Sequence, residues 1–201
     1  MPTIDCYFDY VSPFAHFIVE PLTALAARAG AELVWKPIPI GGLSNFAGDG
    51  PYSPQRRTYV VKDAIRCAEF YGVETNTPSP FPMNSDLALR GALAAQDAGV
   101  FDAYHRRVFR AGWSDRRDIA DEAVLAECFR EAGGDAEALL AEARRDETQS
   151  RVEALLAEAE ARGVFGIPTA VLDDELFWGN DRLAMLEWRL QPGPGLGEHR
   201  G

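Results

Sequence analysis

The sequence has few cysteines, and no two of them have the spacing of a redox pair or a zinc site. Cys6, Cys67 and Cys128 are the three cysteines among 201 residues, and none forms a Cys-x-x-Cys pair. This spacing excludes a dithiol redox motif and a zinc knuckle. Cys6 alternates with apolar neighbours, and Cys128 falls on the apolar stripe of an expected helix. Both are interpreted as buried structural thiols, because a free cysteine behaves as a small hydrophobe.

The sequence also lacks a long apolar run and an excess of positive charge. No apolar run approaches the roughly 20 residues of a membrane span, and residues 1–5 lack the basic region that opens a secretory signal. The formal net charge is −11, from 31 acidic and 20 basic residues, which opposes binding to nucleic acid or to an anionic membrane. With 47% hydrophobic residues, the chain is expected to be a cytoplasmic globular protein with its own core.

The first 40 residues have the pattern of a strand, a helix and a second strand. Residues 2–8 alternate and contain β-formers, and residues 32–38 form a second such run. Between them, Ser12 is placed to cap a helix that has Pro13 in its first turn and ends at Gly30. This order predicts a βαβ unit with a parallel strand pair and a right-handed crossover.

From residue 41 to about residue 150, helical periodicity replaces extended alternation. Glycines and capping residues divide this region into several amphipathic helices. The predicted helices cover residues 54–71 and 84–98, a segment capped by Asp121, a short one capped by Asp135, and a last one that ends at Gly163. The loops at 41–53 and 75–82 are rich in Gly, Pro, Ser and Asn, and loops of that length are often functional.

After Pro168 the extended pattern returns, with a hairpin at 169–172 and 175–178 and a last helix at 182–190. This connectivity predicts an α/β fold, a thioredoxin-like domain interrupted by an all-helical insertion. The thioredoxin-like domain is discontinuous and comprises residues 1–40 and 151–190, and the insertion comprises 41–150. Residues 191–201 are expected to be a disordered tail.

The start of the first helix is where a thioredoxin-like domain places its reactive thiol, and here that residue is Ser12. A hydroxyl cannot exchange disulfides, but it can donate a hydrogen bond to a thiolate that a ligand supplies. Taken alone, Ser12 is more simply explained as a helix cap.

A second segment, GVFGIPT at residues 163–169, makes a binding site the better explanation. A cis bond before Pro168 would present the backbone of Ile167 as a strand edge, on which an extended peptide can pair. Asn180 and Asp181, at the start of the last helix, are suited to an α-carboxylate and an α-ammonium group. Asp181 as a mere helix cap remains the alternative for that residue.

These segments resemble a known family. The motifs are FDYVSPF at 8–14, FPMN at 81–84, FRAGW at 109–113, GVFGIPT at 163–169 and ELFWGNDRL at 175–183. Over residues 3–188 the chain resembles the 2-hydroxychromene-2-carboxylate isomerases, relatives of kappa-class glutathione transferases in the DsbA-like branch of the thioredoxin fold. The resemblance implies a glutathione-dependent cis/trans isomerase of an aromatic α-keto acid, in which a thiolate adds to a double bond, the bond rotates, and the thiol is eliminated.

The resemblance also implies roles for individual residues. Ser12 would stabilise the thiolate of glutathione, Ile167 and Pro168 would dock its cysteinyl portion, and three residues would hold its γ-glutamyl end: Asn180, Asp181 and Arg182. The candidates for contacts with the aromatic substrate are Phe14, Arg56 and Asn84, with Arg57, Lys62, Arg66 and Lys36 as further donors that surface solvation explains equally well. Relatives are usually dimers, so a homodimer is expected.

Several residues depart from the family pattern on the expected substrate side. Tyr52 stands where Asn is usual, Arg56 where Lys is usual, His16 where Tyr is common and Cys67 where Trp is common. His16 is one turn from Ser12 and could act as a general base, but packing against the insertion is favoured. No second ligand stands at metal spacing from any histidine, so no metal site is predicted.

Three functions remain open on the sequence alone. The first is the isomerase, and the second is a glutathione transferase acting on another electrophile. The third is a DsbA-like binding module that has lost its redox cysteines. Turnover without net loss of thiol indicates the first, consumption of thiol the second, and peptide binding without turnover the third.

Overall fold

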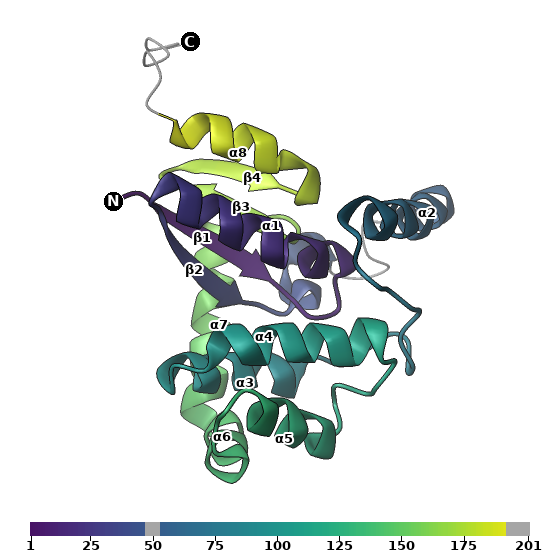
Figure 1. Cartoon of the computed structure of the whole chain (residues 1–201), viewed down its shortest axis with the longest axis vertical. Helices are drawn as coiled ribbons and strands as arrows, with labels where there is room; N and C mark the ends of the chain where they lie inside the picture. The colour runs from purple at the N-terminus through teal and green to yellow at the C-terminus, as the bar shows by residue number, and fades with distance from the viewer. Residues whose placement is uncertain (47–52, 192–201) are drawn as a thin grey trace.

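The computed structural model describes residues 1–46 and 53–191, and its centre is a four-stranded mixed sheet (Figure 1). The strands are β1 (Thr3–Phe8), β2 (Glu32–Pro37), β3 (Thr169–Leu172) and β4 (Glu175–Trp178), in the order β2-β1-β3-β4. β1 pairs in parallel with β2 and antiparallel with β3, and β3 forms an antiparallel hairpin with β4. The predicted βαβ unit and hairpin are confirmed. Tyr52 and most of the predicted disordered tail lie outside the described residues.

The predicted helices occur in the predicted order, and α4 (Phe101–Phe109) is an additional helix outside the predicted ranges. They are α1 (Pro13–Ala29), α2 (Pro54–Tyr71), α3 (Asp86–Asp97), α4 (Phe101–Phe109), α5 (Glu122–Glu131), α6 (Ala136–Ala143), α7 (Asp146–Ala161) and α8 (Leu183–Leu190). Short turns of 3₁₀ helix form η1 (Ile40–Gly42), η2 (Ser44–Phe46) and η4 (Asn180–Arg182), and a π-helical turn, η3 (Arg110–Ser114), extends α4. α7 begins at Asp146, so it crosses the residue at which the insertion was predicted to end.

The predicted caps explain where α1 begins and ends. The hydroxyl of Ser12 accepts a hydrogen bond from the backbone N–H of Ala15 (3.3 Å), and Gly30 adopts the left-handed conformation at φ 62°. α3 begins two residues later than predicted, because the side chain of Asn84 accepts a hydrogen bond from the N–H of Asp86 in a turn before the helix (2.9 Å).

The sheet is buried on both faces. Ile4, Cys6 and Phe8 of β1 point to the larger core, which α1 and the helices of the insertion complete, whereas Tyr7 and Val171 point to a smaller core with α7. This alternation follows the two-residue period of a strand. In Figure 1, α1 lies across the front of the sheet, and α3 to α6 form a layer beyond one end of it.

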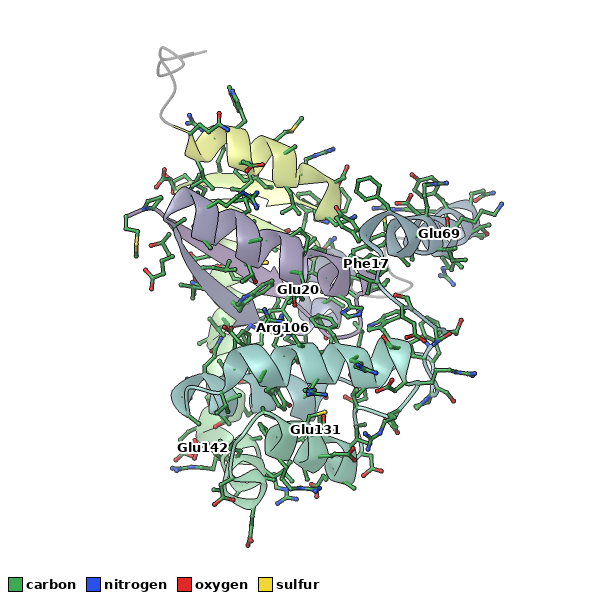
Figure 2. The ribbon with its side chains drawn as sticks, viewed as in Figure 1. Phe17, Glu20, Glu69, Arg106, Glu131 and Glu142 are labelled. Carbon is green, nitrogen blue, oxygen red and sulfur yellow. The ribbon has the colours of Figure 1, made fainter. Side chains whose placement is uncertain are left out.

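α2 stands apart from the rest of the insertion (Figure 1). None of its described residues is buried, although it is 18 residues long. It meets the body of the protein at its carboxyl-terminal end, where the rings of Tyr71 and Phe17 of α1 stack with centroids 6.4 Å apart. Figure 2 shows Phe17 at this junction, and also shows the ion pair between Glu20 of α1 and Arg106 of α4, which ties α1 to the helical layer.

Candidate active site

Sheet pairing brings together the two segments that the sequence singled out. β1 and β3 are antiparallel, and Tyr7 faces Thr169 in the register. Ser12 follows the carboxyl end of β1, and Pro168 precedes the amino end of β3. Because these two ends of antiparallel neighbours lie at the same edge of a sheet, both residues are positioned at one end of the fold.

Ser12 is a buried helix cap whose hydroxyl hydrogen is available to donate a hydrogen bond to a ligand. It is 7% exposed, and its oxygen accepts a bond from Ala15 N–H. No acceptor for its hydroxyl hydrogen occurs among residues 1–46 and 53–191. The start of α1 also carries the positive end of the helix dipole. The hydroxyl can therefore cap the helix through its lone pair and donate its hydrogen to an anionic ligand at the same time.

The segment before β3 presents an unpaired stretch of backbone. The Ile167–Pro168 peptide bond, whose isomer the sequence left open, is cis. The side chain of Ile167 is buried in the smaller core, but within the described part of the chain neither its N–H nor its C=O has a hydrogen-bond partner. Since a buried backbone polar group is normally paired, this edge is suited to an extended ligand that supplies a donor and an acceptor.

η4 lies directly beside this edge. The N–H of Gly179 donates to the carbonyl oxygen of Pro168 (2.9 Å), and Pro168 and Arg182 line one small cavity together with Ile18 of α1. Asp181 and Arg182 are exposed and pair with each other (2.7 Å). The structure thus brings four of the predicted glutathione residues, from Pro168 to Arg182, into one neighbourhood.

Asn180 is buried and has a structural task that the sequence did not indicate. Its side-chain N–H donates to the sulfur of Cys67 (3.3 Å), and its backbone oxygen accepts the hydroxyl hydrogen of Tyr71 (2.9 Å). Burial raises the pKa of the Cys67 thiol, and the bond from Asn180 opposes that shift. Asn180 therefore holds α2 against the site, which leaves Asp181 as the exposed polar group of this pair.

The predicted substrate residues are spread more widely. Phe14 is half-buried, and its ring meets Phe17 edge to face with centroids 6.2 Å apart. Asn84 is exposed in the turn before α3. Arg56 lies in the first turn of α2, eleven residues before Cys67, which places it about 17 Å along the helix axis from the contact with Asn180. Phe14 is therefore beside Ser12, whereas Arg56 is not gathered with the other candidates.

The ammonium group of Lys36 forms ion pairs away from the candidate site. Its ammonium pairs with Glu158 of α7 (2.6 Å) and with Asp5 of β1 (3.4 Å). Tyr7 donates its hydroxyl hydrogen to the same Glu158 oxygen (2.7 Å), so Lys36 belongs to the sheet face that α7 covers. Its charge serves to fasten α7 to the sheet.

His16 packs against the insertion, as the sequence favoured. Its ring stacks on Phe109 at the end of α4 with centroids 5.1 Å apart. Neither ring nitrogen has a hydrogen-bond partner among the residues that the structure describes, and burial lowers the pKa of His16 to about 4. His16 is therefore neutral at physiological pH and contributes an aromatic wall near Ser12.

Asp9 was quoted in the first motif but was given no role, and the structure places it under the site. It is 2% exposed, and burial raises its pKa to about 6. Its carboxylate accepts hydrogen bonds from the Ser85 hydroxyl and from the N–H groups of Val11 and Ile40. Spacing and periodicity gave no signal for this role, because an aspartate after a strand is ordinarily exposed.

Hydrogen bonds fix both the backbone and the side-chain hydroxyl of the next residue, Tyr10. Its backbone oxygen accepts a bond from the indole N–H of Trp113 (2.8 Å), and its hydroxyl lies 3.2 Å from Nδ1 of His105. Trp113 reaches the loop from η3, the π-helical turn. The loop from Asp9 to Ser12 is thus held by side chains of the helical layer.

The other two cysteines, Cys6 and Cys128, are buried, as expected. Burial raises the pKa of Cys128 to about 11 and that of Cys6 above its usual range. Across the described residues there is no group of three His, Cys, Asp or Glu side chains that could hold a metal ion. In the same ranges, no helix has the length and apolar character needed to cross a membrane.

Comparison with known proteins agrees with this geometry. The family model of the DSBA-like thioredoxin domain matches residues 3–191. A 2-hydroxychromene-2-carboxylate isomerase of Sphingobium xenophagum is 36% identical over 195 residues, covering 92% of this chain and 96% of that protein. Glutathione S-transferase kappa 1 of Caenorhabditis elegans is 25% identical over 211 residues, covering 95% and 92%.

The structural comparison points to the same group. A solved 2-hydroxychromene-2-carboxylate isomerase superposes with a TM-score of 0.82 at 28% identity, covering 94% of both chains. The predicted thioredoxin-like fold with a helical insertion is therefore confirmed. By sequence and by structure, the chain belongs to the family of 2-hydroxychromene-2-carboxylate isomerases, within the DSBA-like thioredoxin domains.

Proposed function

We propose that the protein is a glutathione-dependent isomerase of 2-hydroxychromene-2-carboxylate, or of a close aromatic α-keto acid, with trans-o-hydroxybenzylidenepyruvate as the product. The observation that carries the proposal is the Ser12 hydroxyl at the start of α1, whose hydrogen has no acceptor in the described chain. The names of the relatives, an isomerase and a kappa-class transferase, support both the reaction and the cofactor.

The residues at this end of the fold fit glutathione. The N–H and C=O of Ile167, which have no partner among the described residues, match the donor and acceptor of a cysteinyl residue in an extended tripeptide. The exposed carboxylate of Asp181 suits the γ-glutamyl ammonium, and Arg182 beside it suits a carboxylate. The buried Asn180 supports this end by fixing η4 against α2.

Bound glutathione would supply a thiolate that adds reversibly to the conjugated double bond of the ring-opened substrate, so that the bond can rotate. The task of Ser12 is to lower the pKa of that thiol by donating a hydrogen bond in a site with little water. Phe14 and His16 would provide an aromatic surface for the substrate ring. Asn84 and Arg56 would donate to its carboxylate, with Arg56 reaching the site by movement of α2 or from a second subunit.

An absorbance time course with 2-hydroxychromene-2-carboxylate tests the proposal. We expect equilibration with the ring-opened isomer when glutathione is present, no catalysis without it, and no net loss of thiol. Consumption of thiol would instead indicate a transferase that acts on an electrophile. Peptide binding without turnover would indicate a binding module, and absence of glutathione binding by calorimetry would refute the site itself.

We also propose that the protein is a cytoplasmic homodimer that uses α2 as its interface. α2 has no buried residue, yet Val61, Ile65 and Phe70 on it are 62%, 58% and 81% exposed. Val61 and Ile65 are one turn apart and share a face of the projecting helix, and an exposed apolar pair of this kind marks an interaction surface, whereas Phe70 lies on the opposite face. A second copy of the chain is the occupant that we propose, in keeping with the homodimer expected from the sequence resemblance.

Replacing Ile65 by glutamate is expected to raise the dimer dissociation constant ~100-fold, because a charge is disfavoured in the apolar core of an interface. Met185→Glu on α8 is the matched control, since Met185 is 57% exposed and the same charge is introduced there. Light scattering over a range of concentrations measures both variants. A wild-type protein that is monomeric at high micromolar concentration would refute the dimer, and equal effects of the two substitutions would refute α2 as the interface.

A further inference from the structure

The carboxylate of Asp9 lies where three parts of the protein meet. Oδ1 accepts hydrogen bonds from the Ser85 hydroxyl (2.6 Å) and from the N–H of Val11 (3.2 Å), and Oδ2 accepts one from the N–H of Ile40 (2.9 Å). Ser85 precedes α3 in the helical layer, and Ile40 opens η1 after β2. One side chain therefore joins the loop before α1, the end of the βαβ unit and the insertion.

The same residue also holds Ser12 through its backbone. The carbonyl oxygen of Asp9 accepts the N–H of Ser12 (3.1 Å), while its carboxylate accepts the N–H of Val11. Two of the three residues between Asp9 and the start of α1 are thus bonded to Asp9 itself. Any displacement of the Asp9 side chain is passed directly to the backbone that presents the Ser12 hydroxyl.

The arrangement is costly for stability. Asp9 is 2% exposed, and none of the ion pairs in residues 1–46 and 53–191 includes it. The charge that acts on it is the neighbouring Asp86, which also disfavours ionisation. Ser85 stands at the cap position of α3 but makes no side-chain cap bond, because its hydroxyl is given to Asp9. A buried carboxylate without a cation is strongly disfavoured unless hydrogen bonds compensate.

An uncharged residue of the same shape cannot replace this carboxylate. Each of its two oxygens accepts from a backbone N–H, one from Val11 and the other from Ile40. An amide has one accepting oxygen and one donating nitrogen, so in either orientation Asn would set its NH₂ group against a backbone N–H. The site therefore selects a double acceptor, which is what a carboxylate provides.

We propose that Asp9 is a positioning residue of the thiolate site, which fixes the backbone before Ser12 and locks it to α3 and η1. This inference rests on the proposed glutathione-dependent isomerase, and it adds a residue that does not itself touch the reacting atoms. Ser85 acts with Asp9 as the contact from the helical layer.

The test is Asp9→Asn, compared with Asp86→Asn as a matched control. Both substitutions remove one carboxylate from neighbouring parts of the protein, but the side chain of Asp86 is exposed and does not bond the loop. Asp9→Asn is expected to lower kcat ~10- to 100-fold with KM for the aromatic substrate changed less than 3-fold, since small misplacement of a catalytic group has effects of this size. The pKa of bound glutathione, followed by the ultraviolet absorbance of the thiolate, should rise in Asp9→Asn and stay unchanged in Asp86→Asn.

Ser85→Ala is measured alongside, because Asp9→Asn removes a backbone bond and can fail to fold. It deletes the bond to the helical layer and leaves both backbone N–H bonds in place, so we expect a 3- to 10-fold lower kcat and a raised thiolate pKa. Normal thiolate pKa and kcat in a folded Asp9→Asn protein, or in Ser85→Ala if the first does not fold, would overturn the proposal. A wild-type protein that neither binds glutathione nor isomerises the substrate would refute the proposed function instead.

Discussion

Replacing Ser12 by alanine is expected to lower isomerase turnover ~100- to 1000-fold and to raise the pKa of bound glutathione. Removal of one preorganised donor to a developing or bound anion costs a factor of this order. Ser12 is 7% exposed and its hydroxyl hydrogen has no acceptor among residues 1–46 and 53–191, so the bond that it donates would be little weakened by water. Stopped-flow turnover and titration of the thiolate absorbance give the two values.

The same substitution removes a helix cap, so the two roles of Ser12 must be separated. Loss of the bond from Ala15 N–H is expected to cost about 1 kcal/mol of unfolding free energy. Ser12→Asp is the discriminating control, because an ionised aspartate accepts the cap bond but has no hydrogen to donate. If Ser12→Asp retains both stability and turnover, Ser12 is a cap alone, and if Ser12→Ala leaves the thiolate titration unchanged, its assigned role is wrong.

The stability advantage of His16→Phe over the wild type is expected to grow by about 3 kcal/mol as the pH falls from 7 to 4. Burial lowers the pKa of His16 to about 4 in the folded protein, against about 6.5 in the unfolded chain. Between pH 6.5 and 4, His16 is protonated in the unfolded state but not in the folded state, so the free energy of unfolding of the wild type falls as the pH falls. Phenylalanine keeps the stacking on Phe109 and gives up no hydrogen bond to a described residue.

The variant must be compared with the wild type at the same pH, because the titration of Asp9 changes the stability of both proteins with pH in the direction opposite to that of His16. Its pKa is raised to about 6, so its contribution to stability is fully present below about pH 4 and is lost as the pH rises through 6. His105 adds to the effect of His16, since burial lowers its pKa as well. Urea unfolding at pH 7, 5.5 and 4 measures the comparison, and a difference that stays constant over this range would contradict it.

The features that the sequence predicted correctly depend on residues that are close together in the chain. The limits of α1 follow from Ser12, Pro13 and Gly30, which are adjacent to the ends that they define. The hairpin of β3 and β4 follows from a two-residue turn between alternating runs. The motifs identify the Ser12 and Pro168 segments, whereas their meeting at one end of the sheet depends on the pairing of β1 with β3, which no local pattern codes.

What it missed depends on contacts between distant parts of the chain. The bond from Ser85 to Asp9 spans 76 residues, and the bond from Asn180 to Cys67 spans 113. Neither contact is marked by spacing or periodicity, since Ser85 and Asn180 stand at helix starts, where polar residues are ordinary, and Cys67 lies within α2. Such polar contacts are decided by which side chains are brought together in the folded protein, and one sequence does not reveal that.

The central position of β1 has a consequence for biosynthesis. β2 follows β1 closely and can cover one of its edges early, but the other edge is reserved for β3, which is about 160 residues further along the chain. At roughly 5–20 residues per second, the ribosome needs on the order of ten to thirty seconds to deliver it. During that interval the nascent chain carries an open, apolar strand edge, so chaperone occupancy and the rate of translation should set the yield of the protein in a heterologous host.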